Sequence, residues 1–149
     1  MIYLKDITSE NWRIPLEVAP SQKTYVADKT TLLARAYAYR QAHSYAFLIY
    51  HNETPVGMGL YYDCEEMQCY VFSQLFIDKR YQGKGYGLAA VKLVLNSLKQ
   101  DGRYDKVSIC YIEGNTPARR LYEKLGFIET EQDGNEIIME RNLSAPVSC

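Results

Sequence analysis

The stretch Arg80–Gly87, RYQGKGYG, places glycine at the alternate positions 83, 85 and 87 between two strongly apolar segments. Upstream, residues 69–77 (CYVFSQLFI) are almost continuously apolar, which is typical of a central strand covered on both faces. Downstream, leucine and valine recur at helical spacing from about Gly87 to Lys99. A strand that runs into a glycine-rich turn and then a helix leaves backbone N–H groups free beside the positive end of the helix dipole. The stretch therefore predicts an anion site, and a pyrophosphate fits it.

Other interpretations of this stretch are less satisfactory. A nucleotide-triphosphate loop needs Ser or Thr after its lysine, but Lys84 is followed by Gly85. A dinucleotide fingerprint is met only if Ala90 replaces its third glycine, and no parallel βαβ unit precedes it. Spacing alone also allows a glycine-rich turn without a ligand. Arg80 and Lys84 add charge at the rim of the site or are simply solvated surface cations.

Length and composition set the boundaries of the interpretation. The chain has 149 residues, which suits one domain, and we expect it to span residues 1–143 with a tail at 144–149. Its 17 Lys and Arg against 18 Asp and Glu give a net charge of -1, which argues against nucleic acid and anionic membranes as partners. No apolar run approaches the ~20 residues of a membrane span, and the amino terminus shows no signal-peptide core, so we expect a cytoplasmic protein. The four cysteines show no paired short spacing, which predicts free thiols and no metal site.

Apolar periodicity predicts a series of strands and helices along the rest of the chain. Strands are expected at 1–7, 45–50, 56–63 and 106–112, followed by a hairpin around an Asp-Gly turn at 128–140. Helices are expected from Thr8, over 27–43, and over 116–125 with Thr116 as the N-cap and Pro117 in the first helical position. The order predicts a mixed α/β layer fold, mostly antiparallel in its first half.

Two motifs in this order carry a family resemblance. Residues 82–87, QGKGYG, match the pattern Q/R-x-x-G-x-G/A of the GNAT superfamily of N-acetyltransferases. Residues 115–127, NTPARRLYEKLGF, resemble the second signature of that family: an asparagine, an alanine three residues on, a tyrosine seven on, then Gly-Phe. The chain thus resembles this family over almost its whole length. The resemblance implies an α+β fold with a central, mixed, mostly antiparallel sheet of six or seven strands flanked by about four helices.

The resemblance also implies a role for acetyl-coenzyme A as cosubstrate, without a metal. By position in the motifs, its pyrophosphate would be held by Gln82, Gly83, Lys84, Gly85, Tyr86 and Gly87. Its pantetheine arm would be held by backbone groups of Leu75, Phe76 and Ile77, where the central strand separates from its neighbour, and by Asn115. A backbone N–H near Ile77 is the implied donor to the carbonyl oxygen.

Tyr122 matches the general acid of the family. A phenol with a pKa near ~10 can protonate a departing thiolate whose pKa is about 8.5. The residue type alone is ambiguous, because a tyrosine on an amphipathic helix is usually a core residue. For Asn115 the alternative is an ordinary loop or cap asparagine. Position in the motif favours the catalytic interpretation of Tyr122.

Within the superfamily the chain looks most like the bacterial spermine/spermidine acetyltransferases. This resemblance implies direct transfer of the acetyl group to a primary amine, such as spermidine or spermine, in a ternary complex. Asp63, Glu65, Glu66 and Glu113, at expected strand ends near the site, are candidates for a general base or for holding distal ammonium groups, and no base is assigned. The alternatives are another small amine, a protein amino terminus, or a non-catalytic acyl-coenzyme A binding module. Many relatives form dimers, which leaves a homodimer open.

Overall fold

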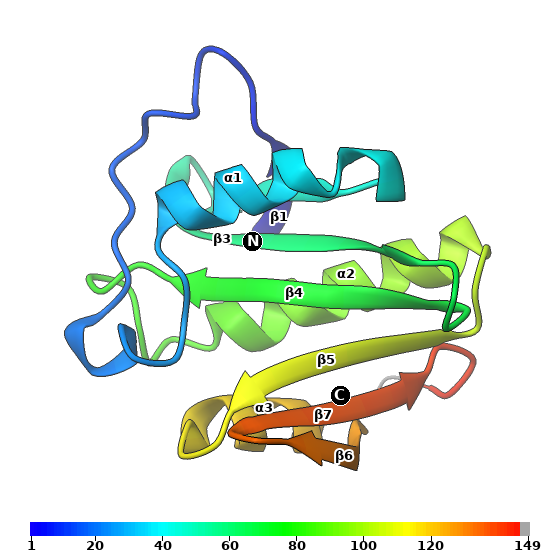
Figure 1. Cartoon of the computed structure of the whole chain (residues 1–149). Coiled ribbons are helices and arrows are strands. Elements are labelled where there is room, and N and C mark those ends of the chain that lie inside the picture. The colour runs from blue at the N-terminus through cyan, green and yellow to red at the C-terminus, as the bar shows by residue number, and fades with distance from the viewer. Residues whose placement is uncertain (147–149) are drawn as a thin grey trace.

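In the computed structural model, which describes residues 1–146, seven strands form one sheet in the order β1-β2-β3-β4-β5-β7-β6. The strands are β1 (Ile2–Asp6), β2 (Tyr45–His51), β3 (Thr54–Cys64), β4 (Cys69–Ile77), β5 (Lys106–Ile112), β6 (Ile128–Asp133) and β7 (Glu136–Asn142). All neighbouring strands are antiparallel except β4 and β5, which are parallel. The expected mixed, mostly antiparallel sheet is confirmed (Figure 1).

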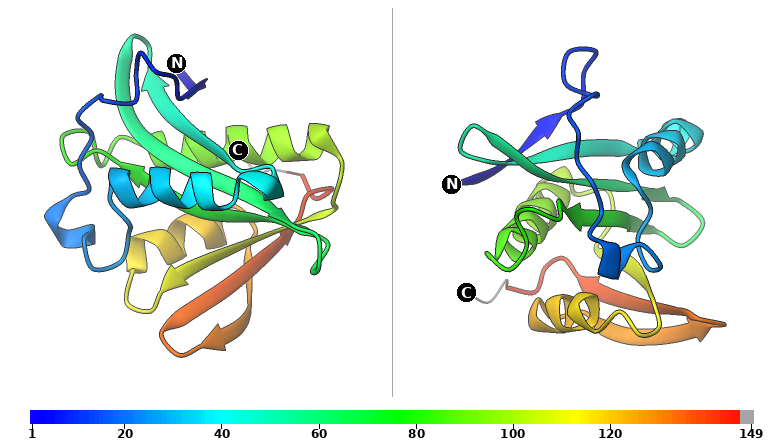
Figure 2. Two further views of the ribbon diagram at one scale, coloured as in Figure 1. Left: turned by 45° about the horizontal axis from the view of Figure 1, so that its top comes forward. Right: turned by 90° about the vertical axis from the view of Figure 1, so that its left-hand side faces the viewer.

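Helices cover both faces of the sheet. Helix α1 (Lys29–Ala38) lies on one face, and α2 (Tyr86–Asp101) and α3 (Thr116–Lys124) lie on the other (Figure 2). The apolar stripe of α2 packs into the larger core, whereas Leu32 of α1 packs with Leu48, Leu60 and other residues in a second core. Residues 1–146 contain these three α-helices and two short 3-10 turns, η1 (Pro20–Gln22) and η2 (Arg40–Ala42), where the resemblance implied about four helices.

Three helix boundaries differ from expectation. The helix expected from Thr8 is only a turn, in which Trp12 N–H donates to the Thr8 carbonyl at 3.1 Å, and Pro15 follows too soon for a helix to continue. The helix expected over 27–43 forms only from Lys29 to Ala38. It begins there because the Asp28 side chain caps it by accepting from Thr31 N–H at 2.8 Å, and residues 40–42 form the separate turn η2.

The third helix begins one residue earlier than expected. Asn115 is the N-cap instead of Thr116, since its side-chain oxygen accepts from Ala118 N–H at 3.4 Å. Pro117 therefore occupies the second helical position, where its missing N–H costs nothing. The shift leaves Asn115 buried at the carboxyl end of β5, with 4% of its surface exposed.

Strands β4 and β5 pair over only part of their length. Their paired residues are Tyr70–Phe72 with Val107–Ile109, after which the two strands diverge toward their carboxyl ends (Figure 1). On the other edge of β4 the register to β3 shifts between Leu60 and Tyr61, so that Ser73 is an extra, bulged residue. The divergence opens a gap in the middle of the sheet.

The inner face of β3 has room for glycine alone at position 59. A Cβ built on Gly59 overlaps the ring of Phe47, a fully buried residue on β2. We expect Gly59→Ala to lower the free energy of unfolding by about 1–3 kcal/mol in urea denaturation, through overpacking. Phe47→Leu should relieve part of this loss when both changes are combined. Losses that simply add in the double variant would contradict the steric explanation.

Candidate functional site

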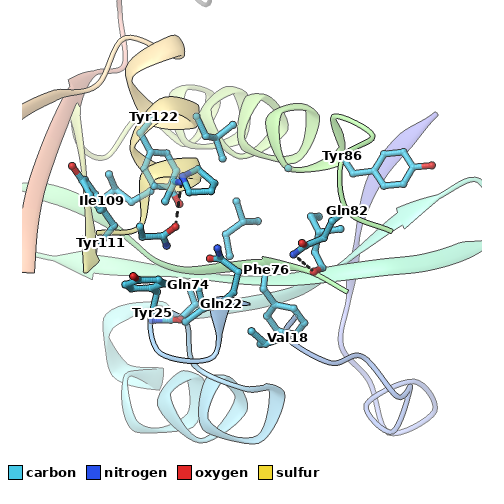
Figure 3. Close-up of a pocket in the computed structure, with 18 of the residues that line it drawn as sticks. Val18, Gln22, Tyr25, Gln74, Phe76, Gln82, Tyr86, Ile109, Tyr111 and Tyr122 are labelled. Atoms are coloured by element: carbon cyan, nitrogen blue, oxygen red, sulfur yellow. Dashed lines mark hydrogen bonds between the residues drawn. The ribbon is translucent and has the colours of Figure 1, made fainter. Parts of the chain in front are cut away.

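The gap between β4 and β5 holds a cavity of about 360 Å³. Its walls come from the carboxyl ends of the two strands, the loop 81–87, the first turns of α3 and the segment 18–26 (Figure 3). These parts are far apart in sequence, and they meet around the gap that the divergence of β4 from β5 opens. The cofactor-binding and catalytic residues that the resemblance implies all line this cavity except Lys84, which is exposed outside it.

The glycine loop is shaped to present backbone N–H groups. Gly83 and Gly85 have φ angles of 78° and 81°, in the left-handed region that favours glycine, and a Cβ on either would meet nothing within 4 Å. Within residues 1–146, the N–H groups of residues 82–85 have no hydrogen-bond acceptor, and those of Tyr86 and Gly87 lie in the first turn of α2. The sixteen-residue helix α2 adds its positive dipole end and has no acidic residue in its first turn. An anion therefore fits here.

Gly87 keeps the inner end of this loop clear. A Cβ at this position would project into the space between Ile77 and Leu121, at 3.8 and 3.9 Å from their side chains. The loop is steadied from the strand side, because the Gln82 amide donates to the Ile77 carbonyl at 3.3 Å. A narrow ligand can thus pass from the loop into the gap.

Backbone groups of β4 alternate between β3 and the gap. Asp78 N–H donates to the Val56 carbonyl of the β3 side at 2.7 Å, so by alternation Phe76 also pairs with β3 while Leu75 and Ile77 direct their main chains into the gap. Backbone groups of Leu75, Phe76 and Ile77 were all expected to face the gap, but only those of Leu75 and Ile77 do so. Phe76 contributes its side chain, which lines the cavity on the α1 side.

Tyr122 reaches the cavity from α3 (Figure 3). Its ring packs edge-on against Phe127 at 5.7 Å between centroids, and 7% of the residue is exposed. Burial raises the pKa of the phenol well above 10, because the phenolate would lose its solvation. Tyr122 is therefore both a core residue and a protonated hydroxyl at the cavity wall.

The opposite wall was not foreseen from the sequence. Gln22, Tyr25 and Gln74 approach from the side facing α1 (Figure 3). Gln74 accepts from Ala27 N–H at 3.2 Å, and the Tyr25 hydroxyl lies against Gly114 at the start of α3. Segment 18–26 has no periodic pattern from which its place at the cavity could be predicted. The one signal in the sequence was Gln74, a polar residue in the otherwise apolar end of β4.

Charged side chains are missing from the walls of the cavity, as far as residues 1–146 are concerned. Asp63, Glu65 and Glu66, which were expected near the site, lie instead at the end of β3 and in the β3–β4 turn, at the opposite end of β4 from Ile77 and the glycine loop. Asp63 is buried there beside Arg103 and His43. Glu113 follows β5 at the correct end but is exposed, and its side chain accepts from Gln132.

Within residues 1–146, no group of three or more His, Cys, Asp and Glu residues is arranged to hold a metal ion. None of the helices in these residues is both long enough and apolar enough to cross a bilayer.

Comparison with known proteins identifies relatives of this arrangement. The model of a family described as the acetyltransferase (GNAT) family matches residues 4–127. A spermine/spermidine N(1)-acetyltransferase from Bacillus subtilis is 29% identical over 135 residues, which cover 85% of this chain and 87% of that protein.

Solved structures share the fold at lower sequence identity. An acetyltransferase from Thermus thermophilus superposes with a TM-score of 0.78 at 17% identity, over 95% of this chain and 96% of that one. A spermidine N-acetyltransferase from Vibrio cholerae, in complex with CoA and spermine, superposes with a TM-score of 0.76 at 18% identity, over 96% of each chain.

The raised pKa of Tyr122 makes a spectroscopic prediction. At pH 11, where an ordinary tyrosine is largely ionised, we expect Tyr122 to remain protonated in the folded chain. The folded protein and its Tyr122→Phe variant should therefore show equal tyrosinate absorbance at that pH and differ only after unfolding. The stability that this protonation contributes is full below pH ~10 and declines above it. One extra tyrosinate in the folded wild type, with a midpoint near 10, would contradict the burial effect.

Proposed function

Because the chain belongs to the GNAT family of acetyltransferases and is therefore an acyl-CoA-dependent N-acetyltransferase, we propose that it acetylates a primary amine, a polyamine such as spermidine or spermine, from acetyl-CoA. The observation that carries the proposal is the cavity between β4 and β5, which joins an anion-binding loop to a protonated tyrosine. Transfer is direct, with both substrates bound together.

The residues of the cavity fit acetyl-CoA as the donor. The N–H groups of residues 82–87 would hold the pyrophosphate, with α2 adding its dipole. The main chains of Leu75 and Ile77, together with the Asn115 side chain, would hold the pantetheine arm between the strands. When bound, acetyl-CoA supplies an acetyl thioester. The Ile77 N–H would polarise its carbonyl oxygen.

Tyr122 would deliver the proton to the departing sulfur. Its raised pKa keeps the hydroxyl protonated at neutral pH, so it can donate a hydrogen bond to the sulfur as negative charge develops there. Because this phenol is a weaker acid than a thiol of pKa about 8.5, full proton transfer to sulfur is uphill, and the proton that the nitrogen loses on becoming an amide restores the phenol. Ala118 and Leu121 lie on the same helix and line the same wall, so they exclude water beside the phenol. Asn115 caps this helix and sets where it begins.

The amine would react as the neutral free base. An ammonium group entering walls without carboxylates would lose its solvation without an ion partner, which favours release of its proton on entry. No side chain is assigned as general base. Gln22, Gln74 and Tyr25 can instead accept hydrogen bonds from the nitrogen that enters from their side.

A polyamine acceptor is supported by the Bacillus subtilis relative, which is a spermine/spermidine acetyltransferase. Carboxylates also lie just outside the cavity. Burial raises the pKa of the cavity residue Cys110 to about 11, and the negative charge of the nearby Glu136 makes a smaller contribution in the same direction. The distal ammonium groups of a polyamine would remain in solvent near Glu136 and Glu113.

We also propose a cytoplasmic location. Cys64, Cys69 and Cys110 are all free thiols in the structure, which suits a reducing compartment. A homodimer stays a prediction.

The assigned acid can be tested by removing one oxygen atom. We expect Tyr122→Phe to bind acetyl-CoA nearly as tightly as wild type, because the ring packing is kept, while kcat falls by about 10²-fold or more. Calorimetry gives the affinity, and release of free CoA thiol gives kcat. Tyr111→Phe is the matched control, since this residue also lines the cavity and is as buried, at 7% exposed. Unchanged turnover in Tyr122→Phe would remove the residue from the mechanism.

The acceptor is tested by a panel of amines in the same thiol-release assay. We expect turnover with spermidine and spermine to exceed that with monoamines, amino acids and a peptide amino terminus. Turnover restricted to another amine would reject the polyamine while keeping the enzyme class. Binding of CoA without transfer to any amine would instead favour an acyl-CoA-binding module.

A further inference from the structure

Asp78 is a buried carboxylate that the proposed mechanism does not use. It follows β4 directly and is only 1% exposed. Its Oδ1 accepts from Arg80 N–H at 2.9 Å and from Arg80 Nε at 2.8 Å, and its Oδ2 accepts from Glu17 N–H at 2.8 Å. These hydrogen bonds outweigh burial and hold the pKa of Asp78 below its usual range. The carboxylate is thus charged and fully engaged.

The partners of Asp78 belong to two separate walls of the cavity. Arg80 leads directly into the anion-binding loop 82–87, while Glu17 leads directly into segment 18–26, which we call the acceptor wall. Their backbones are joined further, because Lys79 N–H donates to the Glu17 carbonyl at 3.0 Å. Arg80 Nη2 donates to the Pro15 carbonyl at 3.2 Å. Residues 15–17 are therefore tied to residues 78–80 by both main-chain and side-chain contacts.

The far end of the acceptor wall is held by the same strand. Gln74 of β4 accepts from Ala27 N–H at 3.2 Å. The wall thus spans the distance between two side chains, Gln74 of β4 and Asp78 just after it, and contains only the short turn η1 as regular structure. Its internal backbone hydrogen bonds are local turns between residues 19 and 26, so they do not fix its position against the sheet, and the hydrogen bonds of residues 17 and 27 to residues 78 and 74 do.

We propose that Asp78 is a positioning residue that holds the anion-binding loop and the acceptor wall in register, so that both substrates meet at the cavity. This inference rests on the proposed function. The main chain of Glu17 and the side chain of Arg80 share one carboxylate, so a shift of either wall is transmitted to the other. Asp78 touches neither substrate, because it does not line the cavity.

The role requires a carboxylate and not merely a polar group. Both oxygens of Asp78 face N–H donors, so an asparagine would turn its own NH₂ group toward a donor whichever way it is oriented. Asp78→Asn therefore keeps the size of the side chain and breaks one of the two attachments.

We expect Asp78→Asn to raise the Kd for CoA and the KM for both acetyl-CoA and spermidine by about tenfold, while kcat changes by less than about threefold. We also expect faster trypsin cleavage after Lys23, an exposed residue of the acceptor wall. Calorimetry measures the Kd for CoA without any amine acceptor present. Cleavage at Lys23 reports on the wall without any ligand.

Asp63→Asn is the matched control. Asp63 is also a buried carboxylate, at 8% exposed, and it is paired with Arg103, but it lies at the other end of β3. Its variant should lose stability, as Asp78→Asn does, while keeping wild-type Kd, KM and Lys23 cleavage. Unchanged Kd and cleavage in Asp78→Asn, or equal changes in Asp63→Asn, would overturn the inference.

If Asp78→Asn does not fold, Arg80→Met tests the positioning role of Asp78 instead. The Arg80 side chain is 53% exposed, so its loss is tolerable, and Arg103→Met supplies the corresponding control at the far end. We expect Arg80→Met to raise the Kd for CoA several-fold and to speed cleavage at Lys23, and neither effect in Arg103→Met. Wild-type values for Arg80→Met would overturn the inference. If wild type itself fails to bind CoA, the proposed function fails, and cleavage at Lys23 still tests Asp78.

Discussion

The short pairing between β4 and β5 is the constraint on which the site depends. Each strand pairs along its length with its other neighbour, β3 or β7, yet the two pair with each other through three residues each. Main-chain groups of Leu75 and Ile77 are consequently left without a strand partner in the middle of the sheet. Because unpaired backbone groups are costly to bury, a sheet keeps such an edge only where solvent or a ligand can satisfy it.

The proposed recognition of acetyl-CoA at this site would rely on backbone dipoles and neutral side chains. The anion-binding loop offers N–H groups and a helix end in place of a row of cations, which explains why Lys84 can lie outside the cavity. Charged side chains lie outside the cavity walls, where Asp78 accepts hydrogen bonds from Arg80 and from the Glu17 main chain. Burial raises the pKa of Tyr122 and keeps it a neutral hydrogen-bond donor, and the lack of charged side chains in the cavity walls of the described residues favours a neutral amine in the proposed mechanism.

Elements with strong periodicity or distinct punctuation were predictable. The apolar run of β4, the stripe of α2 and the Asp-Gly hairpin all formed close to where the sequence placed them. The expected helix at Thr8 did not form, because local capping signals cannot outweigh Pro15. Thr116 lost the N-cap position to Asn115 because both residue types cap helices and the choice depends on where β5 ends. The acidic residues at 63–66 were misplaced because a sequence does not say which end of a hairpin faces the site.

The sequence by itself determined a central strand, a glycine turn and a helix in immediate succession, and with them the anion-binding loop, since those features depend on neighbours along the chain. The resemblance of the second motif to the family signature also implied that Asn115 and Tyr122 belong to the same site, and both line the cavity. Only the tertiary structure decided that β4 diverges after Phe72, that Leu75 and Ile77 instead of Phe76 direct their main chains into the gap, and that segment 18–26 closes the cavity. The reason is physical: strand register and the contact of Asp78 with Glu17, 61 residues apart, arise from long-range packing that no local pattern encodes.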